Sequence, residues 1–288
     1  MKRHLLIHIG MPKCGSTYLQ QVLLQNRARL AQAGVSYPHD GDSHPGNGYG
    51  AHLADCARLE ALFDGRDRLI LSHEDLFSKG GIARPLAQAA RDLDLRVDVL
   101  AFIRPFSEFV YGDYSQNMKQ KFGAFLAARR AYDGLDFMAF AARRASTLDP
   151  SVRFGQWRDT FAGQGFTLRS HRDIRTTFDA LYPDLALDWT VPRGAVNPSL
   201  WMSECEALAR MINSPFARFA PMRGWIKMRF RAAMNAAANR QDDPGRTPTR
   251  TVALEALFKQ QNADLLAKFD YDNRSPRARA TSTGAGRS

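Results

Sequence analysis

The chain has 288 residues, of which 44% are hydrophobic and 24% are charged. These shares are ordinary for a folded globular protein and exclude a disordered or fibrous chain. The chain contains 40 Lys and Arg against 29 Asp and Glu, which gives a net charge of +11.

The positive charge is concentrated toward the C-terminus. Residues 215–250 contain eight Lys or Arg and two Asp, and residues 273–288 contain four Arg and no acid. The rest of the chain is therefore almost neutral. A nucleic-acid-binding domain would spread its basic residues over a folded face, so we expect no nucleic-acid partner. We expect residues 273–288 to form a disordered basic tail.

The N-terminus and the cysteines favour a cytoplasmic protein. No run approaches the roughly 18 apolar residues that a membrane-spanning helix needs. The apolar stretch that begins at Leu5 continues into Pro12 and Lys13 without a small-residue cleavage site, unlike a signal peptide. The three cysteines are scattered without metal-ligand spacing, so we expect no disulfide framework and no metal.

Short apolar runs alternate with helical patterns along the chain. Strands are predicted at residues 5–9, 69–71, 97–103 and 166–169, with a helix over 16–33 and an aromatic-rich helix after the third strand. This alternation predicts an α/β fold in which a parallel sheet is flanked by helices. We expect one domain over residues 1–272 that includes a basic helical and loop segment at 215–250.

Three clusters of polar residues follow predicted strands, at residues 10–17, 72–75 and 104–115. In open parallel α/β sheets, ligands bind outside the carboxyl ends of the strands. These clusters are therefore the candidate functional residues.

The first cluster has the composition of an anion-binding loop. Gly15 permits close backbone approach, and the helix that follows points unpaired N–H groups at a ligand. Lys13 adds a positive charge, and Ser16 and Thr17 add hydroxyl donors. In the P-loop of nucleotide triphosphatases the Lys follows the last Gly, whereas here it precedes Gly15. The alternative is an ordinary strand-to-helix turn with an incidental lysine.

The order Pro-Lys-Cys-Gly-Ser-Thr at residues 12–17, placed after an apolar strand, resembles the 5′-phosphosulfate-binding loop of sulfotransferases that use 3′-phosphoadenosine 5′-phosphosulfate (PAPS). Weaker similarities lie at residues 167–173, 196–204 and 258–272. The resemblance implies a P-loop-like fold, with the amides of residues 15–17, Ser16 and Thr17 on the 5′-phosphate. It also implies that Lys13 contacts the oxygen between phosphorus and sulfur, with Cys14 as a spectator within the loop.

The same family binds the 3′-phosphate of PAPS with an Arg at a strand end and a Ser eight residues later. Arg104 matches the Arg, but the eighth residue after it is Gly112. Ser115 and Ser107 are the alternatives for the missing hydroxyl. Arg104 has an alternative of its own, because a strand-end arginine also pairs with a carboxylate such as Glu108.

Transfer to a hydroxyl needs a base near the acceptor oxygen. Glu74 directly follows the second strand and is the first candidate, and His73, His8 and Asp75 are its rivals. The resemblance implies a PAPS-dependent sulfotransferase that modifies a hydroxyl of a glycan or lipid-linked glycan and releases adenosine 3′,5′-bisphosphate without a metal. The alternatives are a nucleotide-dependent kinase with an atypical P-loop and a non-enzymatic basic surface-binding protein.

Residues 224–240 have the pattern of a basic amphipathic helix, with Ile226, Phe230, Ala233 and Ala237 at helical spacing. Such a helix can lie on an anionic membrane, which would make the protein membrane-peripheral. The alternative is a peripheral helix that packs on the protein core.

Overall fold

The computed structural model describes residues 2–41, 44–48, 53, 55–78, 80–192, 199–237 and 243–276. The chain divides into two compact units. Unit 1 comprises residues Met1–Arg104, Asp149–Val196 and Leu265–Tyr271, and unit 2 comprises Pro105–Leu148, Asn197–Asp264 and Asp272–Ser288. The single domain expected over residues 1–272 stays a prediction.

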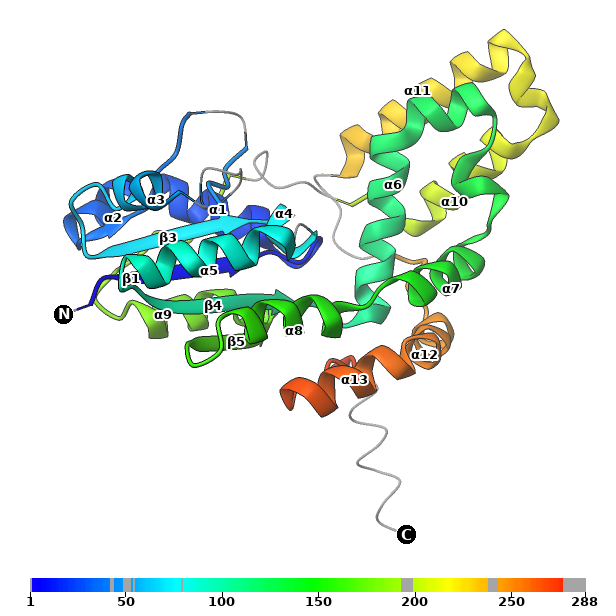
Figure 1. Ribbon diagram of the computed structural model, residues 1–288. Coiled ribbons are helices and arrows are strands. Elements are labelled where there is room, and N and C mark those ends of the chain that lie inside the picture. Colours follow the sequence, from blue (N-terminus) through cyan, green and yellow to red (C-terminus); the bar gives the residue numbers. More distant parts are fainter. Residues whose placement is uncertain are drawn as a thin grey trace. The chain divides into compact units, whose positions relative to one another are not determined.

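Unit 1 contains a five-stranded parallel sheet (Figure 1). Its order is β2-β3-β1-β4-β5, with the bounds Val35–Ser36, Arg68–His73, His4–Ile9, Arg96–Ile103 and Gly165–Ser170. The α/β fold and all four predicted strands are confirmed. The two-residue strand β2 was not predicted, because a strand of that length has no detectable period.

Helices cover both faces of this sheet. Three of them share one apolar core with the strands, in which Leu19, Leu30 and Phe178 pack with Leu6 and Leu100. These three are α1 (Ser16–Gln25), α2 (Arg27–Gln32) and α9 (Ile174–Leu181). On the other face lie α5 (Ala83–Asp92) and α8 (Pro150–Thr160), which Figure 1 shows in front of the strands. Two shorter helices of unit 1 are α3 (Cys56–Leu62) and α4 (Asp75–Ser78).

The single helix expected over residues 16–33 is wrong, because the chain breaks at Asn26 into α1 and α2. The Asn26 amide donates to the carbonyl oxygens of Val22 at 2.8 Å and Asp188 at 2.9 Å. Its oxygen accepts from the Asp188 N–H at 2.9 Å. The buried Asn26 side chain thus links the junction of α1 and α2 to a segment 162 residues away in the chain.

Unit 2 is helical in its described residues. Its helices are α6 (Phe106–Ala128), α7 (Phe137–Thr147), α10 (Met202–Asn213), α11 (Ala220–Ala237) and α12 (Pro248–Leu257). Helix α13 (Lys259–Phe269) begins in unit 2 and ends in unit 1. In the core of unit 2, the rings of Tyr114 and Tyr132 stack with centroids 3.9 Å apart.

The basic segment at residues 215–250 is mostly helical. Within it, α12 begins at Pro248, where Thr247 caps the helix by accepting from the Arg250 N–H. At the expected tail, the Ser275 N–H donates to Glu255 at 3.1 Å, so unit 2 holds the chain at least that far. Residues 277–288 lie outside the described residues. Within the described chain, no helix combines the length and apolar character needed to span a bilayer.

We predict that Asn26→Ala lowers the free energy of unfolding by about 2–3 kcal/mol, because it removes the three hydrogen bonds that the buried Asn26 side chain makes to the backbone of Val22 and Asp188. Urea denaturation followed by circular dichroism measures this change. The matched control is Asn235→Ala, since Asn235 is exposed on α11. Equal unfolding midpoints for the two variants would contradict this account of the break.

Candidate active site

The turn that leaves the central strand is tight. Strand β1 ends at Ile9 and α1 begins at Ser16. A side-chain Cβ at Gly10 would lie 2.3 Å from the Ser16 Oγ and 3.2 Å from the Glu74 Cα. Gly15 caps α1 in the left-handed region at φ 89°, with no side-chain cap hydrogen bond. Glycine is therefore required at both ends of the loop.

The loop offers hydrogen-bond donors to a ligand. The first N–H groups of α1 have no partners within the helix. The Ser16 Oγ is buried and has no hydrogen-bond partner among the described residues. A phosphate oxygen placed at this helix terminus would accept from both kinds of donor, and the helix dipole favours its negative charge. The residues present therefore fit an anionic group.

Lys13 has an unusual backbone conformation, with φ at 63°. This left-handed conformation costs a non-glycine residue roughly 1–2 kcal/mol. Such strain persists where the surrounding structure imposes it, and it clusters at ligand-binding sites. Lys13 is half-buried, and Cys14 beside it is fully buried with its N–H donating to the Met11 oxygen at 3.3 Å.

The end of β3 brings Glu74 to this loop. Ile9 and His73 are partners in the parallel pairing of β1 with β3. Gly10 directly follows Ile9, and Glu74 directly follows His73. The Glu74 side chain is half-buried, and its carboxylate makes no hydrogen bond or ion pair with another described residue. Its rival His73 is buried, with Nδ1 accepting from the Asp75 N–H at 3.0 Å.

The structure places His8 in the sheet core. Its side chain is fully buried, and Nδ1 lies 2.8 Å from the Ser72 Oγ, which also accepts from the Gln20 amide at 3.3 Å. Burial lowers the pKa of His8 to about 3, so the ring is neutral near pH 7. His8 on β1 and Gln20 on α1 thus both hydrogen-bond to Ser72 on β3.

A second group of basic side chains lies where β4 and β5 end. Residues Ile103 and Ser170 are paired, so Arg104 and His171 each come one residue later on neighbouring strands. Burial and the positive charge of Arg104 lower the pKa of His171 to about 4. The buried His171 Nδ1 has no hydrogen-bond partner among the described residues.

His171 was not among the predicted site residues. The available indication was its position two residues beyond the strand predicted at residues 166–169. The predicted strand stopped at residue 169, one residue short of the observed end of β5.

The other residues expected at the 3′-phosphate belong to α6 in unit 2. Gly112 is buried there and has no side chain to offer. The Ser115 Oγ accepts from the Leu200 N–H at 2.8 Å, and the Ser107 Oγ donates to Glu255 at 2.6 Å. Both hydroxyls thus contribute to the packing of unit 2, and their grouping with Arg104 stays a prediction.

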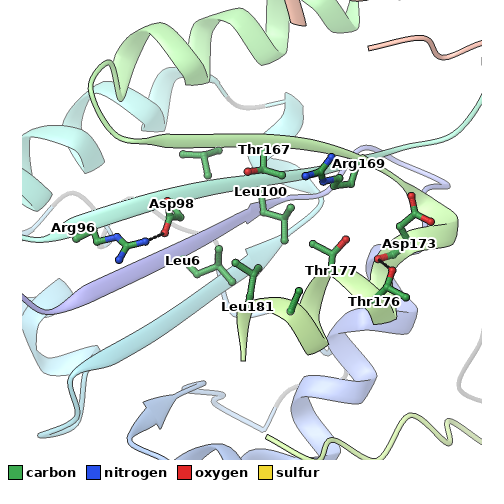
Figure 2. A pocket seen from close by; sticks show the side chains of 12 residues that line it. Leu6, Arg96, Asp98, Leu100, Thr167, Arg169, Asp173, Thr176, Thr177 and Leu181 are labelled. Atoms are coloured by element: carbon green, nitrogen blue, oxygen red, sulfur yellow. Dashed lines mark hydrogen bonds and ion pairs between the residues drawn. The ribbon is translucent and has the colours of Figure 1, made fainter. Parts of the chain in front are cut away.

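A pocket of about 500 Å³ lies on the sheet face beside α9 (Figure 2). Leu6 and Leu100 lie on its strand side, and Thr177 and Leu181 come from α9. No lining residue belongs to residues 10–17 or 72–75. The pocket is therefore separate from the residues expected to carry the chemistry. Within the described residues, no group of three or more His, Cys, Asp or Glu side chains is placed to hold a metal ion.

We predict that acid destabilises the protein in part through His8. Its pKa falls from an ordinary 6.5 to about 3 on folding, so the unfolded chain binds the proton more tightly. Stability is therefore full above pH 6.5 and is lost as the pH falls toward 3, at about 1.4 kcal/mol per pH unit. Urea midpoints measured at pH 7 and pH 4.5 should differ less in His8→Asn, which can keep the bond to Ser72, than in wild type.

The control is His39→Asn, which replaces a partly exposed histidine. This variant should keep the wild-type dependence on pH, and His171 should add a residual dependence to every variant. An unchanged pH dependence in His8→Asn would show that His8 is not held neutral by burial.

Comparison with known proteins gives distant similarity to solved structures. No protein-family model matches this chain, and no curated protein matches it. Among solved structures, a sulfotransferase from Alicyclobacillus acidocaldarius is similar at 13% sequence identity and a TM-score of 0.46, covering 96% of this chain and 99% of that chain. A likeness at this distance assigns no activity to the chain.

Proposed function

We propose that this chain is a sulfotransferase that moves a sulfuryl group from PAPS to a hydroxyl of a glycan or lipid-linked glycan. The observation that carries the proposal is the loop at residues 10–17. Its residue order resembles the phosphosulfate-binding loop, and it leaves the central strand with Gly15 left-handed and the Ser16 hydroxyl buried without a protein partner. Adenosine 3′,5′-bisphosphate is the second product.

The loop binds the 5′-phosphate side of the donor. The N–H groups of Gly15, Ser16 and Thr17 point out of the first turn of α1 and hold phosphate oxygens. The Ser16 hydroxyl donates a further hydrogen bond. PAPS supplies the activated sulfuryl group when it is bound. Lys13 stabilises the negative charge that grows on the oxygen leaving sulfur, and this interaction is strongest in the transition state.

Arg104 is proposed to bind the 3′-phosphate. Its planar guanidinium can donate two parallel hydrogen bonds to one phosphate group. His171 follows the neighbouring strand and is the second donor that unit 1 offers, because an anion beside it favours the protonated ring. Gly112 has no side chain to contribute to such a site.

Glu74 is proposed as the base. Its carboxylate accepts the proton of the acceptor hydroxyl while that oxygen forms its bond to sulfur and the bond from sulfur to the 5′-phosphate oxygen breaks. The backbone contact between Glu74 and Gly10 keeps the base beside the loop. Lys13 and the helix terminus supply the positive charge at the leaving oxygen, and the proposal therefore includes no metal.

A reducing cytoplasm is the proposed location. None of the three cysteines forms a disulfide, and Cys14 lies in the proposed donor loop, where an oxidised thiol would disturb it. The glycan acceptor is proposed ahead of other hydroxyl compounds.

We predict that wild type binds adenosine 3′,5′-bisphosphate in preference to ATP with magnesium, as measured by titration calorimetry. Lys13→Ala and Arg104→Ala should each weaken bisphosphate binding about 10- to 100-fold, because each removes a charge-assisted hydrogen bond to phosphate. Arg96→Ala is the matched control, since Arg96 is an exposed arginine at the other end of β4.

The same titrations separate the alternatives. Binding of ATP but not of the bisphosphate would replace the sulfotransferase with a kinase. Binding of neither nucleotide by folded wild type would favour a surface-binding protein. Equal losses in Arg96→Ala and Arg104→Ala would remove Arg104 from the proposed donor site.

We further predict that Glu74→Gln lowers turnover about 10²- to 10⁴-fold, the range that a positioned general base contributes. Turnover is measured with PAPS and a glycan acceptor identified by screening. Affinity for the bisphosphate should be unchanged, because Glu74 is proposed to act on the acceptor. Asp75→Asn is the matched control and should keep near-wild-type turnover. If Glu74→Gln retains most of the turnover, the base is another residue.

A further inference from the structure

Large apolar side chains are exposed around α11 and the short 3₁₀ turn before it, η6 (Pro215–Arg218). Nine large apolar side chains of the described residues are exposed by more than about a third, and five of them lie within residues 216–234. These five are Phe216, Phe219, Trp225, Met228 and Met234. Exposed apolar side chains gathered in one short segment mark an interaction site.

The protein core does not account for these side chains. Helix α11 (Figure 1) already packs within unit 2 through Ile226, Ala233 and Ala237, which are buried. Trp225 is 45% exposed and Met228 is 58% exposed. Both lie on a different side of α11 from the three buried residues. The exposed apolar residues are therefore available to a partner outside unit 2.

The same segment is uniformly basic. Residues 215–237 contain five Lys or Arg and no Asp or Glu. Two of the five lie against exposed aromatic rings, with Arg218 4.8 Å from the ring centre of Phe219 and Arg229 5.7 Å from that of Trp225. Positive and apolar groups thus occupy the same outer surface.

The other three cations form a row. Arg223, Lys227 and Arg231 are spaced four residues apart and therefore lie along one side of α11. They line a groove of about 540 Å³ together with Phe122 and Phe230, whose stacked rings have centroids 3.8 Å apart. Around the helix, this row lies on one side of the exposed Trp225 and Met228, and Arg229 lies on the other side. Cations therefore flank the two apolar side chains.

We propose that residues 216–234 dock on a lipid bilayer that contains anionic lipids. A helix of this kind lies in the interface, with its apolar side chains in the boundary between headgroups and acyl chains and its cations at the lipid phosphates. Tryptophan is well suited to this depth, since its ring is apolar and its N–H remains at the headgroups. A bilayer of this kind would therefore bind both the exposed apolar side chains and the positive charges of residues 216–234.

Nucleic acid explains only one of these properties. Its phosphates would attract the five cations, but they offer no apolar environment for Phe216, Trp225 and Met228. A bilayer accepts the cations and the apolar side chains at once. The inference does not depend on the proposed sulfotransferase activity, because it is drawn from surface residues of unit 2 alone.

Co-sedimentation with vesicles tests this inference. Wild type should bind vesicles of phosphatidylcholine with phosphatidylglycerol, should bind phosphatidylcholine alone far more weakly, and should be released by salt. The triple variant R223Q/K227Q/R231Q should bind at least about tenfold more weakly, since each cation near an anionic surface contributes about fivefold. The variant W225S/M228S, with its charge unchanged, should also lose at least about tenfold.

The matched control is R58Q/R84Q/R153Q, which removes three exposed arginines of unit 1 and the same total charge. It should bind like wild type, and circular dichroism should show every variant folded. An equal loss in this control would mean that net charge alone drives binding. The inference is overturned by that result or by a folded wild type that does not bind anionic vesicles. It is also overturned if W225S/M228S binds like wild type while heparin or duplex DNA competes fully.

Discussion

The tight turn from β1 into α1 is the constraint on which the proposed site depends. Because β1 pairs in parallel with both β3 and β4, three strand ends meet at one edge of the sheet. Gly10 allows the Ser16 hydroxyl and the Glu74 backbone to approach within distances that no side chain would permit. The N-terminus of α1 and the backbone of Glu74 thereby lie beside Gly10, as the proposed phosphosulfate binding and proton removal require.

Much of the fold could be predicted from sequence, because its strands are short continuous apolar runs that a buried parallel sheet requires. The position of the loop followed from the same runs. The break at Asn26 could not be predicted, since its partner Asp188 is 162 residues away in the chain. The hydrogen bond of His8 to Ser72 also depended on tertiary structure, because it joins β1 to β3.

The part of the candidate site that is formed by residues adjacent in sequence could be predicted from residue type and order. The loop at residues 10–17 is local, and its lysine, glycine and hydroxyls are all adjacent in sequence. Arg104 and His171 become neighbours only through the pairing of β4 with β5. The basic segment was visible as composition, whereas the exposure of Trp225 and Met228 beside its cations was visible only in the folded helix.

The most direct measurement is a crystal structure of the chain with adenosine 3′,5′-bisphosphate bound. We expect the 5′-phosphate at the N–H groups of residues 15–17, with the Ser16 Oγ donating to one of its oxygens and the Lys13 Nζ nearby. We also expect the 3′-phosphate within hydrogen-bond distance of Arg104. A bisphosphate bound elsewhere on the protein, with residues 10–17 making no contact to it, would contradict the account.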